Sequence, residues 1–255
     1  MTLLDSAILG VVEGITEFLP ISSTGHLILT STLLGLPATE FLKSFEIAIQ
    51  LGAILAVVFL FWRSFLDFSI LKKIATAFIP TAIIGLLVHD LAKTYLLGNV
   101  EVVVWALGIG GVALIVFELL HKEKEAGAET VSAISYKQAV VVGVFQACAI
   151  VPGVSRSAAT IIGGLVMGVK RVAIVEFSFL LAVPVMAAAT TLDLYKNAST
   201  FSNTDFGNLS VGFLVSFVVA LFAIRFLLHY VRKHTFISFG IYRIVVALLF
   251  FVFVL

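Results

Sequence analysis

The residues that could carry out chemistry lie in two short polar segments of an otherwise apolar chain. In the first segment, Glu13 and Glu17 are four residues apart, which places both carboxylates on one face of a helix. Two carboxylates on one apolar face predict a polar cavity with a cation or a proton between them. The alternative is that one of them, Glu13 in particular, extends to the water at a membrane surface.

A proline and three hydroxyl residues follow the two glutamates. Pro20 ends the first half-helix, and Ser22, Ser23 and Thr24 open the next, so hydroxyls and backbone N–H groups gather at a helix N-terminus. Such an end attracts phosphate, although capping alone would explain an isolated Ser-Thr-Gly. His26 follows Ser23 by three residues on the same face, which predicts an acid or base within reach of a hydroxyl nucleophile.

The second polar segment carries Arg156. Its neighbours with small or hydroxyl side chains are Gly153, Ser155, Ser157 and Thr160. A guanidinium keeps its proton, so in an apolar setting it requires a partner. That partner is either Glu13 or Glu17 in a structural ion pair, or a phosphate held by two hydrogen bonds.

Together, the two segments contain the groups that phosphate chemistry needs. A guanidinium and N–H groups bear charge on the transferred group, carboxylates hold a divalent metal, and a nucleophile works with a proton carrier. A simple ion channel needs neither Ser23 nor His26. Glu46, Gln50 and Glu176 are secondary candidates, because they could equally satisfy nearby backbone groups.

The composition of the chain requires a membrane environment. Of the 255 residues, 61% are hydrophobic, only 12% are charged and 23 are phenylalanine. A soluble domain of this size cannot bury so much apolar surface. The net charge of +1 gives no reason to expect a nucleic-acid partner, and the single cysteine, Cys148, forms no internal disulfide.

The apolar runs predict an all-α, polytopic membrane protein with six crossings and two re-entrant helix pairs. Six runs approach the roughly 20 residues needed to cross the hydrocarbon layer. They lie at about 45–62, 74–89, 100–120, 172–192, 211–231 and 236–255. Two further regions, 6–36 and 138–169, are interrupted by the polar segments, and each half is too short to span the membrane.

The basic residues predict the orientation of these elements. If region 6–36 enters from the outer face, twelve Lys and Arg residues lie on the inner side and three on the outer side, as the positive-inside rule requires. The inner residues are Arg63, Lys72, Lys73, Lys122, Lys124, Lys137, Lys170, Arg171, Arg225, Arg232, Lys233 and Arg243, and the outer ones are Lys43, Lys93 and Lys196. The two interrupted regions then enter from opposite faces.

A faint internal repeat agrees with this layout. A shift of 133 residues aligns 10–13 with 143–146 and 22–24 with 155–157. We therefore predict a single membrane domain, 1–255, of two inverted repeats at about 6–120 and 138–255, joined by a cytoplasmic linker at 121–137. Interrupted helices related in this way meet near the midplane, so the two polar segments should face each other.

The polar segments also resemble a known family. "EGITEFLPISSTGH" and "VPGVSRSAAT", with "FEIAIQLGAILAVV" between them, are similar to the bacitracin-resistance family of undecaprenyl-diphosphate phosphatases over nearly the whole chain. The resemblance implies hydrolysis of the terminal phosphate of this polyprenyl lipid, with Mg²⁺ or Ca²⁺, which recycles the carrier of cell-wall precursors and confers bacitracin resistance. It also implies a bacterial plasma membrane location, with the site open to the outer or periplasmic face.

The resemblance implies a role for each matching residue. The family's paired glutamates, paired serines, histidine and arginine fall on Glu13, Glu17, Ser22, Ser23, His26 and Arg156, while Ala158 stands where the family often has glycine. We expect Arg156 and the N–H groups to hold the diphosphate and the two glutamates to hold the metal or carry protons. The expected substrate-binding residues beside Arg156 are Ser22, Thr24, Gly153, Ser155, Ser157 and Thr160. Ser23 would attack phosphorus or orient a water molecule, with His26 as its acid–base partner.

Other functions fit parts of the pattern. A transporter or flippase of a lipid phosphate uses the same inverted-repeat architecture but requires no nucleophile. Another class of membrane phosphatase has an element similar to "SSTGH" but needs a second histidine downstream of its Ser-Arg pair, and after Arg156 none occurs before His229. A non-enzymatic scaffold would not explain ionisable groups at membrane depth. The sequence leaves the oligomeric state open, and a homodimer is compatible with it.

Overall fold

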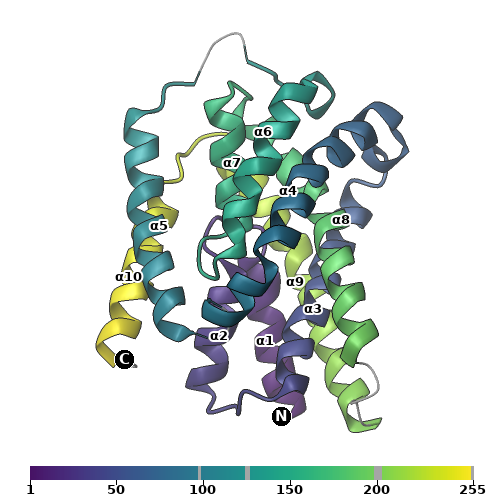
Figure 1. Ribbon diagram of the computed structural model, residues 1–255, viewed down its shortest axis with the longest axis vertical. Helices are drawn as coiled ribbons and strands as arrows, with labels where there is room; N and C mark the ends of the chain where they lie inside the picture. The colour runs from purple at the N-terminus through teal and green to yellow at the C-terminus, as the bar shows by residue number, and fades with distance from the viewer. Residues whose placement is uncertain (97–98, 124–126, 198–202, 254–255) are drawn as a thin grey trace.

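The apolar runs form ten α-helices in the part of the chain that the structure describes (Figure 1). The computed structural model describes residues 1–96, 99–123, 127–197 and 203–253, apart from the side chains of 89–95, 192–194, 196–197 and 203–205. The helices are α1 (Leu3–Thr16), α2 (Ser23–Leu33), α3 (Glu40–Leu60), α4 (Phe68–Tyr95), α5 (Val100–Leu120), α6 (Tyr136–Ala147), α7 (Arg156–Val166), α8 (Arg171–Asn197), α9 (Asn203–Tyr230) and α10 (Ile237–Phe253). The prediction of an all-α, polytopic membrane protein is confirmed.

Five of the predicted crossings form helices that are long and apolar enough to span a membrane. Within the described residues these are α3, α4, α5, α8 and α9. The sixth predicted crossing falls on α10, which has 17 described residues and a length of about 26 Å. The last two residues of that predicted run, 254–255, lie outside the described residues.

Both interrupted regions form pairs of short helices, as predicted. Helices α1 and α2 have 14 and 11 residues, and α6 and α7 have 12 and 11. We call residues 17–22 the first break and residues 148–155 the second break. Figure 1 shows α1 and α2 in the lower half of the molecule and α6 and α7 in the upper half, so the two breaks approach each other in the middle.

The two breaks end in the same backbone conformation. Ser22 and Ser155 have φ of 71° and 79°, and they are the two non-glycine residues with positive φ in the described part of the chain. Each is the N-cap of the following helix, where its hydroxyl accepts a hydrogen bond from the N–H of Gly25 or Ala158. A non-glycine residue in this region costs about 1–3 kcal/mol, and such strain is typical of functional sites.

The short helices pack on long helices of the other half of the chain. Helix α1 packs on α9 and α6 packs on α4, while α3 packs on α8 and α9, and α5 packs on α10. The paired helices approach each other closely at Gly10 and Gly143. A methyl group added at Gly10 would lie 2.7 Å from the Gly212 carbonyl oxygen of α9, and one added at Gly143 would overlap the Ala77 carbonyl oxygen of α4. Small residues permit this close contact between membrane helices.

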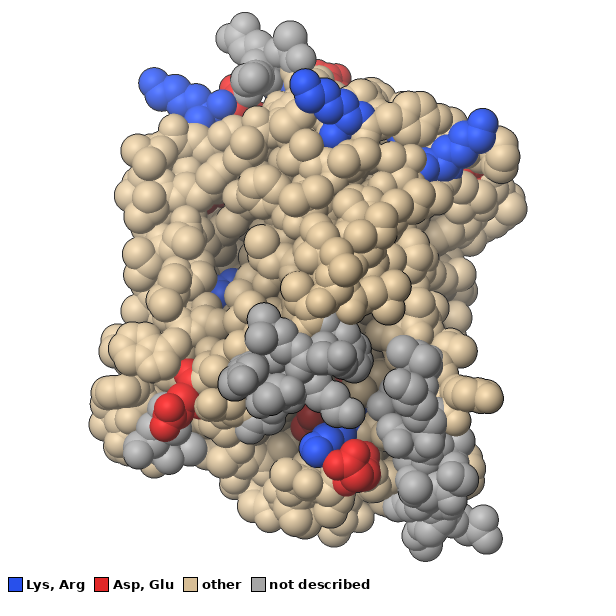
Figure 2. Space-filling view, in the orientation of Figure 1, with Lys and Arg blue, Asp and Glu red and all other residues tan. Residues whose placement is uncertain are grey.

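The outer surface is apolar through its middle and charged at its ends. Leu86 and Leu120 are each 78% exposed, and soluble monomers rarely expose large apolar areas of this kind. On the face seen in Figure 2, most Lys and Arg side chains gather at the upper end, as the charge pattern predicts. Lys124 and the side chains of Lys93 and Lys196 lie outside the described residues.

The packing of α6 on α4 leads to a prediction about stability. Gly143→Ala should lower the free energy of unfolding by about 1–3 kcal/mol, because the new methyl group must displace the Ala77 carbonyl. Gly85→Ala in α4 is the matched control, since an added Cβ there meets nothing within 4 Å. Thermal unfolding in detergent measures both variants. Equal Tm values for the two would contradict the proposed close contact.

Candidate functional site

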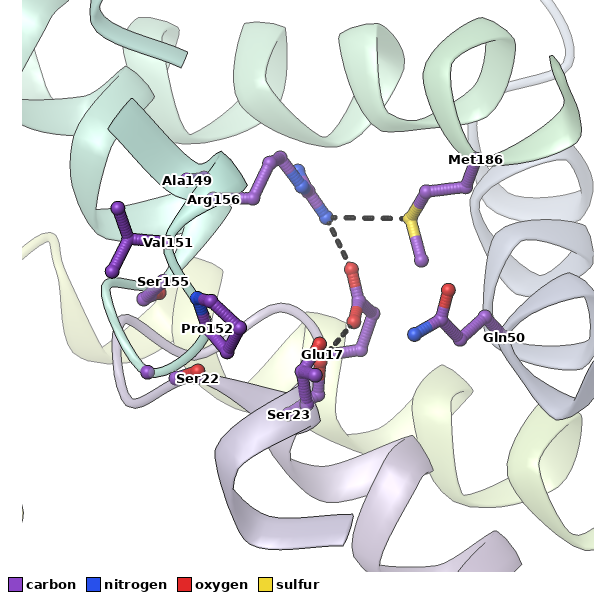
Figure 3. Close-up of a pocket in the computed structure, with 12 residues that line it drawn as sticks. Glu17, Ser22, Ser23, Gln50, Ala149, Val151, Pro152, Ser155, Arg156 and Met186 are labelled. Atoms are coloured by element: carbon purple, nitrogen blue, oxygen red, sulfur yellow. Dashed lines mark hydrogen bonds and ion pairs between the residues drawn. The ribbon is translucent and has the colours of Figure 1, made fainter. Parts of the chain in front are cut away.

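A cavity of about 130 Å³ lies where the two breaks meet (Figure 3). The first break and the start of α2 contribute one side, the second break and the start of α7 contribute another, and α3 and α8 add one residue each. The lining residues are Glu17, Ser22, Ser23, Thr24, Gln50, Ala149, Val151, Pro152, Gly153, Ser155, Arg156 and Met186. The predicted meeting of the two polar segments is confirmed.

Glu17 connects the two breaks at the centre of this cavity. Its Oε1 lies 2.7 Å from Arg156 Nη2, and its Oε2 accepts a hydrogen bond from Ser23 Oγ (Figure 3). Only 5% of the Glu17 side chain and 13% of the Arg156 side chain are exposed. Of the two glutamates that the sequence offers as ion-pair partners of Arg156, Glu17 forms the pair in the structure. Loss of one member of such a buried pair costs about 3–5 kcal/mol, because the remaining charge is left without a partner.

Helix α8 holds the guanidinium of Arg156 from the opposite side. Arg156 Nη1 donates to the Ser178 carbonyl oxygen at 2.8 Å and to Ser178 Oγ at 3.3 Å. Thr160 Oγ1 lies 2.6 Å from Ser178 Oγ, so Thr160 supports this contact from α7. Arg156 Nε is buried and has no hydrogen-bond partner in the described structure. Ser178 therefore holds Nη1 of the guanidinium, while the Nε–H group has no protein partner in the described residues.

Two of the predicted substrate-binding residues do not line the cavity. Thr160 and Ser157 are fully or almost fully buried, and neither lines the cavity. Ser157 Oγ donates to the Phe18 carbonyl oxygen at 2.8 Å, which connects α7 to the first break. Ser22, Thr24, Gly153 and Ser155, by contrast, do line the cavity as predicted.

The predicted contact between Ser23 and His26 is wrong. His26 Nδ1 lies 2.7 Å from the Ser22 carbonyl oxygen, so it donates, and Nε2 accepts from the Tyr242 hydroxyl at 2.9 Å. The His26 ring also stacks on the Tyr242 ring, with centroids 5.5 Å apart and planes 7° apart. Both ring nitrogens are therefore occupied. The partner of Ser23 is Glu17, which comes from the preceding break rather than from the next helical turn.

Glu13 is buried beside the site without a hydrogen-bond partner. It is 0% exposed, and neither of its carboxylate oxygens has a partner in the described structure. The Glu17 N–H donates to the Glu13 carbonyl oxygen, so the two side chains lie one helical turn apart. The described residues contain no group of three His, Cys, Asp or Glu that could hold a metal. Carboxylate oxygens without a hydrogen-bond partner are donors of the type that Mg²⁺ and Ca²⁺ prefer.

The secondary candidates separate into two groups. Gln50 projects into the cavity from α3 (Figure 3). Glu46 accepts a hydrogen bond from Ser31 Oγ at 2.7 Å, and neither Glu46 nor Glu176 lines the cavity.

Sequence reasoning missed three residues that hold the site. Ser178 orients Arg156, Tyr242 orients His26, and Arg243 bonds backbone carbonyls of both breaks. The predicted position of Arg243 on the inner surface is wrong, because this residue is 0% exposed inside the protein. One signal was available, since a basic residue within the apolar run 236–255 is an intramembrane charge and indicates function. Nothing in the local sequence marks Ser178.

Comparison with known proteins agrees with this geometry. The family model described as bacitracin resistance protein BacA matches residues 6–249, which include both breaks. The undecaprenyl-diphosphatase of Sulfurihydrogenibium sp. (strain YO3AOP1) is 53% identical over 98% of this chain and 99% of its own length. The undecaprenyl-diphosphatases of Aquifex aeolicus and Wolinella succinogenes are each 49% identical over 98% of this chain and 98% or 97% of theirs. The chain therefore belongs to the bacitracin resistance protein BacA family.

Proposed function

We propose that the protein hydrolyses undecaprenyl diphosphate to undecaprenyl phosphate and inorganic phosphate. One observation carries the proposal. A serine hydroxyl bonded to a carboxylate faces a buried arginine in a cavity that two helix N-termini enclose. The relatives that match the whole chain are named for this activity. In bacteria the reaction would recycle the lipid carrier of cell-wall precursors and so confer bacitracin resistance.

The proposal includes an architecture of two inverted repeats. Positions 133 residues apart share the same backbone at Ser22 and Ser155 and the same close helix approach at Gly10 and Gly143. On this basis the chain is one membrane domain of six crossings and two re-entrant pairs. The positive-inside rule places the Lys- and Arg-rich end in the cytoplasm, so α1 and α2 enter from the outer face of the plasma membrane.

The cavity suits the head group of a lipid rather than the whole lipid. Its volume of about 130 Å³ is well below the roughly 300–1,000 Å³ of pockets that enclose an entire drug-sized ligand. The prenyl chain would stay in the bilayer, against the exposed apolar side chains of the outer surface. The diphosphate would enter between the N-termini of α2 and α7, whose first N–H groups have no partner in an earlier turn.

Ser23 is the proposed nucleophile and Glu17 its general base. Ser23 Oγ attacks the terminal phosphorus, its proton passes to Glu17, and the bond from phosphorus to the bridging oxygen breaks, releasing undecaprenyl phosphate. Water then cleaves the phosphoserine to give inorganic phosphate. Arg156 leaves Glu17 to hold the phosphate oxygens, and its unpartnered Nε–H offers a further donor. His26 acts through the backbone at Ser22 rather than on the Ser23 hydroxyl.

Glu13 and Glu17 are the proposed carboxylates for a divalent cation, Mg²⁺ or Ca²⁺. When bound, such a cation neutralises negative charge on the diphosphate. The support is the pair of unpartnered Glu13 oxygens, which are costly to bury without a ligand or a proton.

Phosphate release by the purified protein tests the proposed function. In detergent, the wild type should release phosphate from undecaprenyl diphosphate, and EDTA should abolish the release until Mg²⁺ or Ca²⁺ is restored. Glu13→Gln should raise the half-activating cation concentration more than tenfold, because it removes one charged ligand. Glu176→Gln is the control and should behave as wild type, since Glu176 does not line the cavity.

Two results would contradict these expectations. If pure wild-type protein binds the lipid but releases no phosphate, the same architecture serves as a transporter or flippase. If EDTA leaves the rate unchanged, the carboxylates carry protons and do not hold a metal.

Acid quenching with substrate labelled on the terminal phosphate tests the nucleophile. The wild type should retain label on the protein and release undecaprenyl phosphate in a burst, because the first step transfers phosphate to Ser23. Ser23→Ala should retain no label and lose at least about 100-fold in kcat. Ser22→Ala changes the adjacent hydroxyl and should still be labelled. A wild-type rate for Ser23→Ala would remove Ser23 from the chemistry.

A further inference from the structure

Arg243 lies inside the protein, and its hydrogen bonds within the described residues all go to backbone carbonyl groups. It comes from α10 and is 0% exposed. Its guanidinium donates five hydrogen bonds, to the carbonyl oxygens of Pro20 (3.3 Å), Ala106 (3.0 Å), Leu107 (3.3 Å), Gly153 (2.9 Å) and Val154 (2.9 Å). One side chain therefore contacts the first break, the second break and α5 together.

Two of the bonded carbonyls, those of Pro20 and Val154, lie close in sequence to the strained residues Ser22 and Ser155. Pro20 precedes Ser22 by two residues, and Val154 directly precedes Ser155. In a trans peptide the C=O and the N–H point in opposite directions. The bond from Arg243 to the Val154 carbonyl therefore turns the Ser155 N–H away from Arg243. Ser155 lines the cavity and Arg243 does not, so Arg243 contacts the second break on the side away from the cavity.

Arg243 has no carboxylate partner in the described part of the chain. The ion pairs found there join Lys43 to Glu40, Arg156 to Glu17 and Arg171 to Glu118. Burying a cation carries a desolvation penalty even after the protein relaxes, and in the described structure five backbone carbonyls offset it. A buried charge of this kind at membrane depth indicates a functional role.

Helix α5 is shaped to admit the guanidinium. A methyl group added at Gly110 would overlap Arg243 Nη2 and lie 2.8 Å from Cζ. Two residues away, a methyl group added at Gly108 would lie 3.5 Å from Ala247 Cβ, an ordinary contact. The absence of a side chain at position 110 thus serves Arg243 itself.

We propose that Arg243 is a positioning residue, which holds both breaks in register so that the N-termini of α2 and α7 face the same diphosphate. Neighbouring Tyr242 adds to this role through His26, which bonds the Ser22 carbonyl. The inference rests on the proposed phosphatase function, and it assigns to α10 the task of holding the two breaks together.

Arg243→Lys tests the inference, because lysine keeps the charge but cannot reach five carbonyls at once. Arg171→Lys is the matched control. This substitution shortens another largely buried arginine, whose ion pair with Glu118 lies away from both breaks. We expect Arg243→Lys to lose about 10- to 100-fold in kcat on undecaprenyl diphosphate below its Tm, with a smaller change in KM. Arg171→Lys should lower Tm but keep kcat within about twofold of the wild type.

A glycine pair gives a second test if Arg243→Lys does not fold. Gly110→Ala displaces the guanidinium without changing a cavity residue, and it should also lower kcat. Gly108→Ala on the same helix should leave kcat unchanged. A folded Arg243→Lys protein with wild-type kcat would overturn the inference, as would equal losses of kcat in the two members of either pair. A wild type that releases no phosphate would instead overturn the proposed function, and this inference with it.

Discussion

The structure depends on a buried ion pair between two helix breaks that enter the protein from opposite ends. Irregular backbone cannot face lipid, because hydrocarbon offers no partner to free N–H and C=O groups. Each break is therefore stable only where protein or water surrounds it. The Glu17–Arg156 pair joins the first break to the start of α7, and Arg243 donates hydrogen bonds to backbone carbonyls of both breaks. The long helices around them form the wall that separates this polar centre from lipid.

This constraint explains why much of the fold could be predicted from the sequence. Long apolar runs have to become helices in a bilayer, and the run 100–120 matches α5 residue for residue. Polar motifs containing a proline marked the breaks within two further apolar regions, and the charge pattern required them to enter from opposite faces. The need of Arg156 for an anionic partner also followed, but the sequence left open whether that partner is a glutamate or a phosphate. The choice of Glu17 over Glu13 depends on how α7 sits against the first break, which only the structure shows.

The errors in the predicted site have a common cause. His26 was assigned to Ser23 because the two are three residues apart on one helix, but the ring turns to Tyr242, a residue 216 positions away. Arg243 was counted among the cations of the inner side because the charge tally included every basic residue there, although Arg243 lies within the apolar run 236–255. Local spacing reports neighbours along a helix, whereas Tyr242 and Arg243 both come from α10 and contact residues of the two breaks and the helices beside them. Tertiary contacts of this range leave no periodic signal in the sequence.

A structure with a non-hydrolysable undecaprenyl diphosphate analogue would show whether the two breaks share one catalytic centre. We expect the two phosphates to lie between the N-termini of α2 and α7, with Arg156 turned from Glu17 to a phosphate oxygen and Ser23 Oγ closest to the terminal phosphorus. A head group held by only one of the two breaks, with the Glu17–Arg156 pair intact, would contradict a catalytic centre shared between them.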